Sequence, residues 1–289
     1  MQINFISVLR PLFLMYINYR KASGKWCSAY TTGLLNLDAF YYNRYPLLLT
    51  LEQEPIEEWA KQRETEIASS TNKRIAIING FISYCNNHNF SKLNTLTYLK
   101  TLPCTYIPHA FILDEMKKFF KACDEYQPKN PNTIRSKNRM LTIPIIYRLL
   151  YSSGIRTCEA RMLLTKNVNL KDGILNIINS KGPHQHFVAL HENMTQLMIK
   201  YNVAISELYP NRNFFFPEDC TKCLSSACLS NTFVKIWLNC GFKKVRLYDL
   251  RHNYAIININ KWISEQNFNL KFYYLSKSMG HTSLESTQY

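Results

Sequence analysis

The sequence predicts a mainly α-helical chain with a small antiparallel β-sheet (α+β), arranged in two domains. Apolar residues recur at helical spacing through most of the chain. Two short runs of β-type residues flank a Ser-Lys-Gly-Pro turn at residues 180–183. The stretch Thr95–His109 carries two prolines and little periodicity, so we place the domain boundary there. The predicted domains are a helical N-terminal domain, residues 1–102, and a C-terminal domain, residues 107–289.

The N-terminal domain is expected to be helical. The apolar stretch Ile3–Ile17 is interrupted by Arg10 and Pro11 and is interpreted as a first helix that packs on its neighbours. Two further stretches have helical spacing and good helix formers, Ile56–Glu66 and Lys73–Asn87.

The C-terminal domain begins with an amphipathic helix, Leu113–Tyr126, followed by a longer run, Thr133–Tyr151. Pro144 inside the longer run is expected to kink or divide it. Ser153-Gly154 has the composition of a helix C-cap, and a short helix should follow over Thr157–Leu164.

Short runs of strand-forming residues, which interrupt the helical pattern, predict the sheet. The two strands expected are 173–178 and 185–190, joined by the turn at 180–183, and Phe214–Phe216 is interpreted as a buried strand. The remaining helices are expected at Glu192–Val203, Ser230–Cys240, Tyr248–Trp262 and Phe272–Met279.

The charge balance indicates a polyanionic partner. The 289 residues carry a formal net charge of +15, and 46% of them are apolar. A folded, strongly basic chain gains binding free energy when phosphates release their counterions, although a solvated basic surface has the same composition. The N-terminal residues expected to contact phosphates, and so to help clamp a duplex, are Arg20, Lys21, Lys25 and Arg74, with Lys73 and Lys92 beside them in the same group.

No stretch approaches ~20 uninterrupted apolar residues, so no membrane-spanning helix is expected. The nine cysteines are odd in number and scattered, which favours reduced thiols in a cytoplasmic protein. Cys220 and Cys223, with Cys228 and Cys240, resemble a zinc arrangement at first sight. The later spacings do not complete a zinc motif, so we favour ordinary thiols and expect no metal.

Three basic side chains and a late tyrosine are the candidate catalytic residues. Arg156 and Arg251 lie at the starts of helices, where a guanidinium can grip two phosphate oxygens and the helix adds positive potential. His281 follows a glycine, and the last residue is Tyr289. Cleaving a phosphodiester without a metal requires a nucleophile, cations for the non-bridging oxygens and an acid for the leaving oxygen.

These residues lie in segments that resemble the tyrosine recombinase (phage integrase) family. Residues 149–160, Leu-Leu-Tyr-Ser-Ser-Gly-Ile-Arg-Thr-Cys-Glu-Ala, are similar to its first arginine box, and 248–255, Tyr-Asp-Leu-Arg-His-Asn-Tyr-Ala, to its second. Met-Gly-His-Thr-Ser at 279–283 resembles its Leu-Gly-His motif, and 179–182 with 187–190 its β-hairpin lysine. The four matches, in order, cover about residues 107–289. The N-terminal part resembles the family's core-binding (SAM-like) domain.

The resemblance implies a role for each residue. Arg156 and Arg251 would stabilise the pentacoordinate phosphorus, and His281 would hydrogen-bond a non-bridging oxygen. Lys181 would protonate the leaving 5′ oxygen. Glu159 would orient the site and His252 would support the second box. A tyrosine would form a 3′-phosphotyrosyl link, so that site-specific recombination or integration needs no cofactor.

Two departures from the family pattern affect this interpretation. The second box usually begins with histidine or lysine, and here it begins with Tyr248, a phenol that donates a hydrogen bond but is a poor base at neutral pH. The nucleophile commonly lies nine residues after the motif histidine, whereas Tyr289 lies eight residues after His281. On that register the chain stops one residue before its nucleophile and lacks the C-terminal tail, so this form is expected to bind DNA and cleave it poorly or not at all.

Alternatives stay open at the level of sequence. The family implies a homo-tetramer on paired sites in double-stranded DNA. A non-catalytic DNA-binding remnant of an integrase, acting as an architectural or regulatory factor, has the same sequence features. A type IB topoisomerase shares the chemistry, and a zinc-dependent structural module is the weakest of the alternatives.

Overall fold

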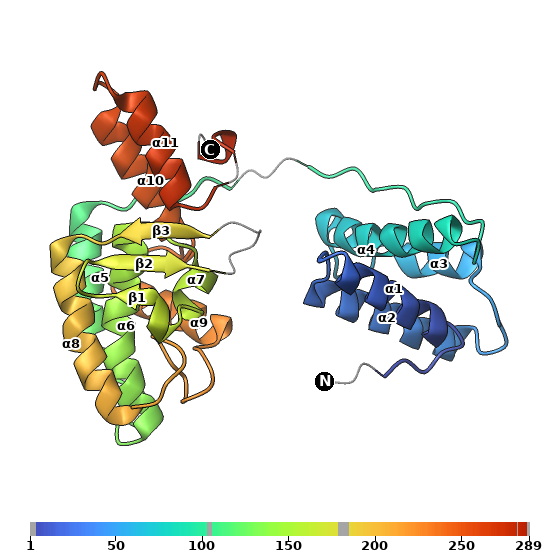
Figure 1. Cartoon of the computed structure of the whole chain (residues 1–289), viewed down its shortest axis with the longest axis horizontal. Helices are drawn as coiled ribbons and strands as arrows, with labels where there is room; N and C mark the ends of the chain where they lie inside the picture. The colour runs from blue at the N-terminus through green and yellow to red at the C-terminus, as the bar shows by residue number, and fades with distance from the viewer. Residues whose placement is uncertain (1–3, 103–105, 179–184, 282, 288–289) are drawn as a thin grey trace. The chain divides into compact units, whose positions relative to one another are not determined.

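The computed structural model describes residues 4–102, 106–178, 185–281 and 283–287, and divides the chain into two compact units, Met1–Thr105 and Tyr106–Tyr289 (Figure 1). The division lies within the proline-containing stretch in which the sequence analysis placed the boundary. Each unit has a hydrophobic core of its own. The two units are therefore described separately.

The N-terminal unit is a bundle of four helices. They are α1 (Arg10–Ala22), α2 (Ser28–Arg44), α3 (Gln53–Ala60) and α4 (Ala68–Asn87). Helix α4 contacts each of the other three. Fully buried side chains from all four fill the centre, among them Phe13, Leu37, Ile56 and Phe81.

Local features move the helix ends away from the predicted ones. The first helix begins at Arg10 and not at Ile3, because Pro11 suits a helix start. The helix predicted over Ile56–Glu66 is Gln53–Ala60 instead. Glu66 lies beyond it, where its carboxylate accepts hydrogen bonds from Arg74 and Thr71. Helix α2 was missing from the prediction altogether.

A ladder of asparagines fastens the chain after α4 back onto that helix. Asn72, Asn79 and Asn86 each donate to one backbone carbonyl and accept from the N–H of the same residue. The partners are Leu99, Leu96 and Leu93 in turn, at 2.7–3.0 Å. Seven helical residues rise about 10.5 Å, and three extended residues span about 10 Å, so the two spacings match. The asparagine ladder therefore holds residues 93–99 in extended form along α4.

The C-terminal unit combines helices with one sheet. Its elements are α5 (Leu113–Asp124), α6 (Ile134–Ser153), α7 (Thr157–Arg161), η1 (Thr165–Asn167), β1 (Val168–Asn169), β2 (Ile174–Ile177), β3 (His186–Ala189), α8 (Glu192–Leu208), α9 (Ser226–Asn239), α10 (Asp249–Trp262), α11 (Phe268–Ser278) and η2 (Glu285–Thr287). The strands lie side by side in the order β1-β2-β3, all antiparallel (Figure 1). Leu175 pairs with Val188 in the centre of the sheet.

Helix α6 organises this unit by packing against α5, α8 and α10. It is a single helix with Pro144 inside it, so of the two expected effects, a kink or a division, the division does not occur. The short helix predicted over Thr157–Leu164 ends at Arg161. Phe214–Phe216 forms no regular strand: Phe214 makes an isolated bridge to Leu164, while Phe215 and Phe216 are buried. The predicted turn at 180–183 lies outside the described residues.

Across the described ranges, no helix is long and apolar enough to cross a membrane. In the same ranges, no group of three or more His, Cys, Asp or Glu side chains is placed to hold a metal ion. The eight cysteines that the structure describes, including Cys220, Cys223, Cys228 and Cys240, are all free thiols.

Candidate active site

Arg156 stands at the junction of α6 and α7. Gly154 ends α6 in the left-handed conformation, φ +63°, and Arg156 is the N-cap residue of α7. The Arg156 backbone N–H and its Nη1 donate to the two carboxylate oxygens of Glu159, at 2.7 and 2.6 Å. The Glu159 side chain is 1% exposed. The buried carboxylate of Glu159 thus holds Arg156 in place through two hydrogen bonds.

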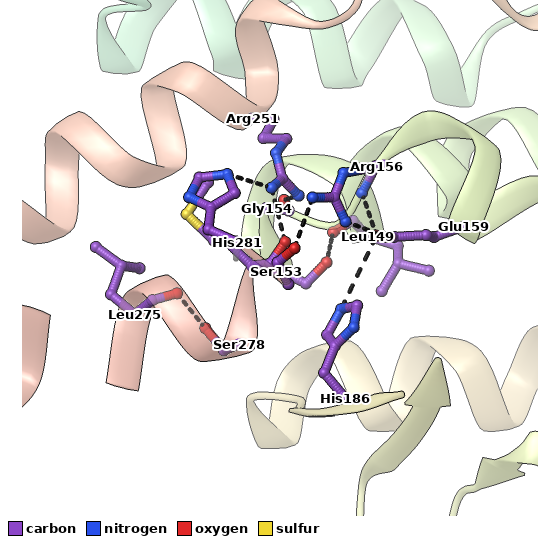
Figure 2. A network of polar contacts seen from close by, with 12 residues as sticks. Leu149, Ser153, Gly154, Arg156, Glu159, His186, Arg251, Leu275, Ser278 and His281 are labelled. Atoms are coloured by element: carbon purple, nitrogen blue, oxygen red, sulfur yellow. Dashed lines mark hydrogen bonds and ion pairs between the residues drawn. The ribbon is translucent and has the colours of Figure 1, made fainter. Parts of the chain in front are cut away.

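Arg251 reaches the same place from the first turn of α10. Its Nη1 donates to the Gly154 carbonyl at 2.7 Å, and its Nη2 donates to the Met279 carbonyl at 2.7 Å. The Nη2 atom of Arg156 donates to the next carbonyl, that of Gly280, at 2.7 Å. Segments nearly a hundred residues apart thereby bring two guanidinium groups to one turn of chain, as Figure 2 shows.

Two glycines make this close approach possible. A Cβ on Gly154 would lie 2.3 Å from Cδ1 of Tyr254. A Cβ on Gly280, whose φ is +67°, would lie 2.6 Å from the His186 ring and 3.0 Å from Nη1 of Arg156. Both positions combine a left-handed backbone with a lack of space, so the glycines in the first and last motifs are required by geometry.

His281 completes the cluster in its neutral form. Its Nε2 lies 2.6 Å from Nη2 of Arg251, and its Nδ1 lies 2.7 Å from Oγ1 of Thr287. A guanidinium can only donate, so Nε2 accepts and the ring proton is assigned to Nδ1, which donates to Thr287. Burial first, and then the charges of Arg251 and Arg156, lower the pKa of His281 to about 4. This ring is therefore uncharged at neutral pH.

The cluster holds more positive than negative charge. Arg251 is 3% exposed, and burial lowers its pKa. In the described part of the chain no acidic side chain lies within ion-pair distance of Arg251, whereas Arg156 has Glu159. A nearly buried cation whose hydrogen-bond partners are carbonyl oxygens, a neutral imidazole and the Tyr248 hydroxyl is well placed to bind an anion.

A cavity of about 380 Å³ opens beside this cluster. It is lined by Arg246, Tyr248, Arg251, His252, Ala255, Met279, His281 and Thr287. Tyr248 is 43% exposed and contacts His252 ring to ring, with centroids 5.1 Å apart. Burial lowers the pKa of His252. Both side chains therefore border the space in which an anion would be held by Arg251.

The sequence and fold of this region match a known family. Residues 111–289 match the model of the phage integrase family, which covers most of the chain. The chain belongs to the phage integrase family of tyrosine recombinases. This is a family of enzymes that recombine DNA, and the two arginine boxes and the Met-Gly-His segment lie within the matched region.

Relatives support this membership. A putative integrase/recombinase, y4rE, of Sinorhizobium fredii is 27% identical over 198 residues, which cover 63% of this chain and 60% of the relative. The tyrosine recombinase XerC of Lactobacillus delbrueckii subsp. bulgaricus is 20% identical over 97% of this chain and 92% of its own length. The family assignment therefore has support along nearly the whole chain.

Solved structures share the fold. The recombinase XerH bound to its difH substrate aligns with a TM-score of 0.63 and 19% identity, over 96% of this chain and 80% of XerH. A lambda integrase fragment bound to a core site aligns with a TM-score of 0.60 and 14% identity, over 96% of each chain. The mainly α-helical fold with its small antiparallel sheet, predicted from the sequence, is thus that of the phage integrase family.

Two of the family's expected catalytic residues, Lys181 and Tyr289, lie outside the described residues. The structure adds two residues that sequence reasoning missed. Thr287 is 4% exposed and contacts His281. His186, at the start of β3, has its Nε2 4.0 Å from the Glu159 carboxylate. No sequence signal marked Thr287, and His186 was visible only as a residue of the second predicted strand.

The predicted phosphate contacts of the N-terminal unit differ in availability. Arg74 pairs with Glu66 at 2.7 Å, donates to the Trp59 and Lys61 carbonyls, and has a side chain only 12% exposed. Arg20 lies over the Tyr30 ring, 4.4 Å from its centroid, and donates to the Lys25 carbonyl. Both guanidinium groups already serve the fold of this unit. The side chains of Lys21 and Lys25 are exposed.

Proposed function

We propose that this phage integrase family member is a site-specific recombinase that cuts and rejoins double-stranded DNA through a 3′-phosphotyrosyl intermediate. One observation carries the proposal. Arg251 is nearly buried and has no carboxylate partner in the described ranges, while Arg156 and His281 lie within hydrogen-bond reach of the same turn. A DNA phosphate held there would supply the missing negative charge.

Phosphate binding would rearrange one hydrogen bond. In the structure Nε2 of His281 accepts from Arg251 and cannot donate. A phosphate oxygen between the two would take the Arg251 N–H, and its negative charge would raise the pKa of His281. His281 could then carry a proton on Nε2 and donate a hydrogen bond to a non-bridging oxygen, in the role that the family implies.

The transfer itself would exchange one ester for another. The proposed nucleophile is Tyr289, eight residues after His281 in place of the nine that the family pattern predicts, so cleavage through it would show the nine-residue register to be wrong for this chain. Its phenolic oxygen attacks phosphorus and gives its proton to a water molecule as the Tyr–O–P bond forms. The bond from phosphorus to the 5′ oxygen breaks, and the Lys181 ammonium gives that oxygen a proton. Arg156 and Arg251 hold the charge of the transition state. Tyr248 borders the cavity as a hydrogen-bond donor rather than as a base.

The partners proposed are double-stranded DNA and three further copies of the chain. Charge and relatives support them: the net charge is +15, and lambda integrase is known as a tetramer bound to a Holliday junction. The exposed Lys21 and Lys25 stay proposed phosphate contacts, whereas the structural partners of Arg20 and Arg74 weigh against such a role for them. We place the protein in the cytoplasm, in keeping with its free thiols.

Covalent trapping tests the proposal. A duplex site would first be selected from a random-sequence pool by binding to the full chain, and then nicked beside the cleavage position. We expect an adduct that survives denaturant, is absent with Tyr289→Phe, and is lost with Arg156→Ala. Salt-dependent binding without any adduct would favour the alternative of a non-catalytic DNA-binding factor.

The same preparation separates the recombinase from a type IB topoisomerase. Relaxation of supercoiled plasmids that lack the selected site would favour the topoisomerase. Exchange between two duplexes that each carry the site would favour the recombinase. Failure to bind duplex DNA at low salt would overturn both.

A further inference from the structure

The first residues of the C-terminal unit are fastened to the helix that carries Arg251. The Tyr106 hydroxyl donates a short hydrogen bond to the Asp249 carboxylate, and the Phe111 N–H donates to Oδ1 of Asn253 at 3.0 Å. Asp249 and Asn253 lie in α10, two residues before and two residues after Arg251. Tyr106 and Phe111, at the start of this unit, thus bind α10 on both sides of Arg251, the proposed phosphate ligand.

These contacts lie in a protected environment. Asp249 and Asn253 are each 1% exposed, and Arg251 is 3% exposed. The carboxylate oxygen that accepts from Tyr106 also accepts from the Arg246 N–H, at 3.0 Å. The Arg246 guanidinium lies 3.4 Å from the centroid of the Tyr106 ring. Tyr106 therefore touches both the residue that leads into α10 and the carboxylate in its first turn.

The buried groups depend on this segment for partners. In the described part of the chain, Oδ1 of Asp249 and Nδ2 of Asn253 have no hydrogen-bond partner. Removing the Tyr106 hydroxyl would leave the Asp249 carboxylate with the Arg246 N–H as its remaining hydrogen-bond donor among the described residues. A buried carboxylate that loses a donor will shift to find another, and it would carry the first turn of α10 with it.

We propose that Tyr106, acting through Asp249, is a positioning residue for Arg251. The inference rests on the proposed function, because Arg251 matters as a phosphate ligand.

The test compares Tyr106→Phe with Tyr98→Phe in the full chain. The first variant keeps the ring under Arg246 and removes only the hydroxyl, whereas Tyr98 is 54% exposed and serves as the control. Three quantities are measured: affinity for the selected duplex, the rate of covalent trapping at saturating DNA, and the NMR titration midpoint of His281. The midpoint reports on Arg251, because that guanidinium bonds the ring and helps to hold its pKa near 4.

With Tyr106→Phe we expect affinity to stay within about threefold, trapping to slow about tenfold, and the His281 midpoint to rise. Tyr98→Phe should change none of the three. An unchanged trapping rate, or an unchanged midpoint, would overturn the proposal, and weaker binding alone would mean a merely structural role. If the wild-type chain forms no adduct, the proposed function fails while the His281 midpoint still decides whether Tyr106 positions Arg251.

Discussion

The two units of this chain use their polar side chains in opposite ways. In the N-terminal unit, three groups of polar side chains have matched donors and acceptors: the asparagine ladder bonds backbone groups, Arg74 pairs with Glu66, and Asp38 accepts from Ser7 and the Ile6 N–H. In the C-terminal unit, Arg156, Arg251 and His281 gather around carbonyl oxygens with one carboxylate among them. Polar groups pair with one another in the first case and leave an unbalanced positive charge in the second, where we propose that a DNA phosphate binds.

A buried arginine has different partners in the two units. Arg74 and Arg251 are both largely buried, but one has a carboxylate and the other lacks one in the described ranges. Breaking a buried ion pair leaves an uncompensated charge and destabilises a fold, whereas removing an unpaired buried charge relieves a cost of desolvation. The same substitution should therefore affect catalysis in one unit and stability in the other.

The largest effect is expected at Arg251. Arg251→Met should slow covalent trapping by about a thousandfold, because a preorganised donor to the phosphate is lost. Its effect on the free energy of unfolding should stay within about 1 kcal/mol, since an uncompensated charge is lost along with its hydrogen bonds. Trapping kinetics and urea denaturation measure the two. Trapping at the wild-type rate would remove Arg251 from the site.

The same substitution at Arg74 in the N-terminal unit should lower stability and leave covalent trapping almost unchanged. Arg74→Met should lower the free energy of unfolding by about 3 kcal/mol, because Glu66 and the Trp59 and Lys61 carbonyls lose their donor. Trapping at saturating DNA should change less than about twofold. A marked loss of DNA affinity with unchanged stability would restore the role in DNA binding predicted from the sequence.

The ion pair between Arg74 and Glu66 should make the free energy of unfolding depend on pH. Hydrogen bonding by Arg74 lowers the pKa of Glu66 to about 2. A carboxylate with a depressed native pKa contributes stability above its unfolded value of about 4.5, and this stability is lost as the pH falls towards 2. The stability difference between wild type and Arg74→Met should therefore shrink between pH 5 and pH 2. A difference that stays constant over this range would mean that the pair contributes no linkage.

A smaller effect is expected from the asparagine ladder. Asn79→Ala removes two hydrogen bonds to Leu96 and should cost about 2 kcal/mol. The Leu96 amide proton should then exchange with solvent faster than in the wild type. Asn87→Ala, at an exposed position of the same helix, is the matched control and should leave Leu96 unchanged. Equal exchange in both variants would show that the ladder does not hold the chain.

The sequence predicted the parts of the molecule that local pattern encodes. The two arginine boxes placed Arg156 and Arg251 at the starts of helices, as the structure has them, because those positions depend on nearby residues. It could not show that Arg74 is paired, since a guanidinium looks the same in sequence whether a carboxylate faces it or not. Nor did it mark Thr287, whose contact with His281 forms only when the chain folds back.

The asparagine ladder is only partly visible in the sequence. Asn72, Asn79 and Asn86 recur every seven residues, and Leu93, Leu96 and Leu99 recur every three. Each spacing is visible in the sequence, but nothing in either shows that the two segments lie side by side. The two repeats match because seven residues of helix and three residues of extended chain have nearly the same length. Only the folded structure shows which segment is helical and which is extended.

The most direct test of the central claim, that the Arg156–Arg251–His281 cluster holds a DNA phosphate, is the NMR titration of His281 with and without saturating duplex DNA. Without DNA, burial and the two guanidinium charges should hold the midpoint near pH 4. A phosphate in the cluster should raise it by at least about one unit, because negative charge favours the protonated ring. A midpoint that DNA binding leaves unmoved would mean that the phosphate lies elsewhere.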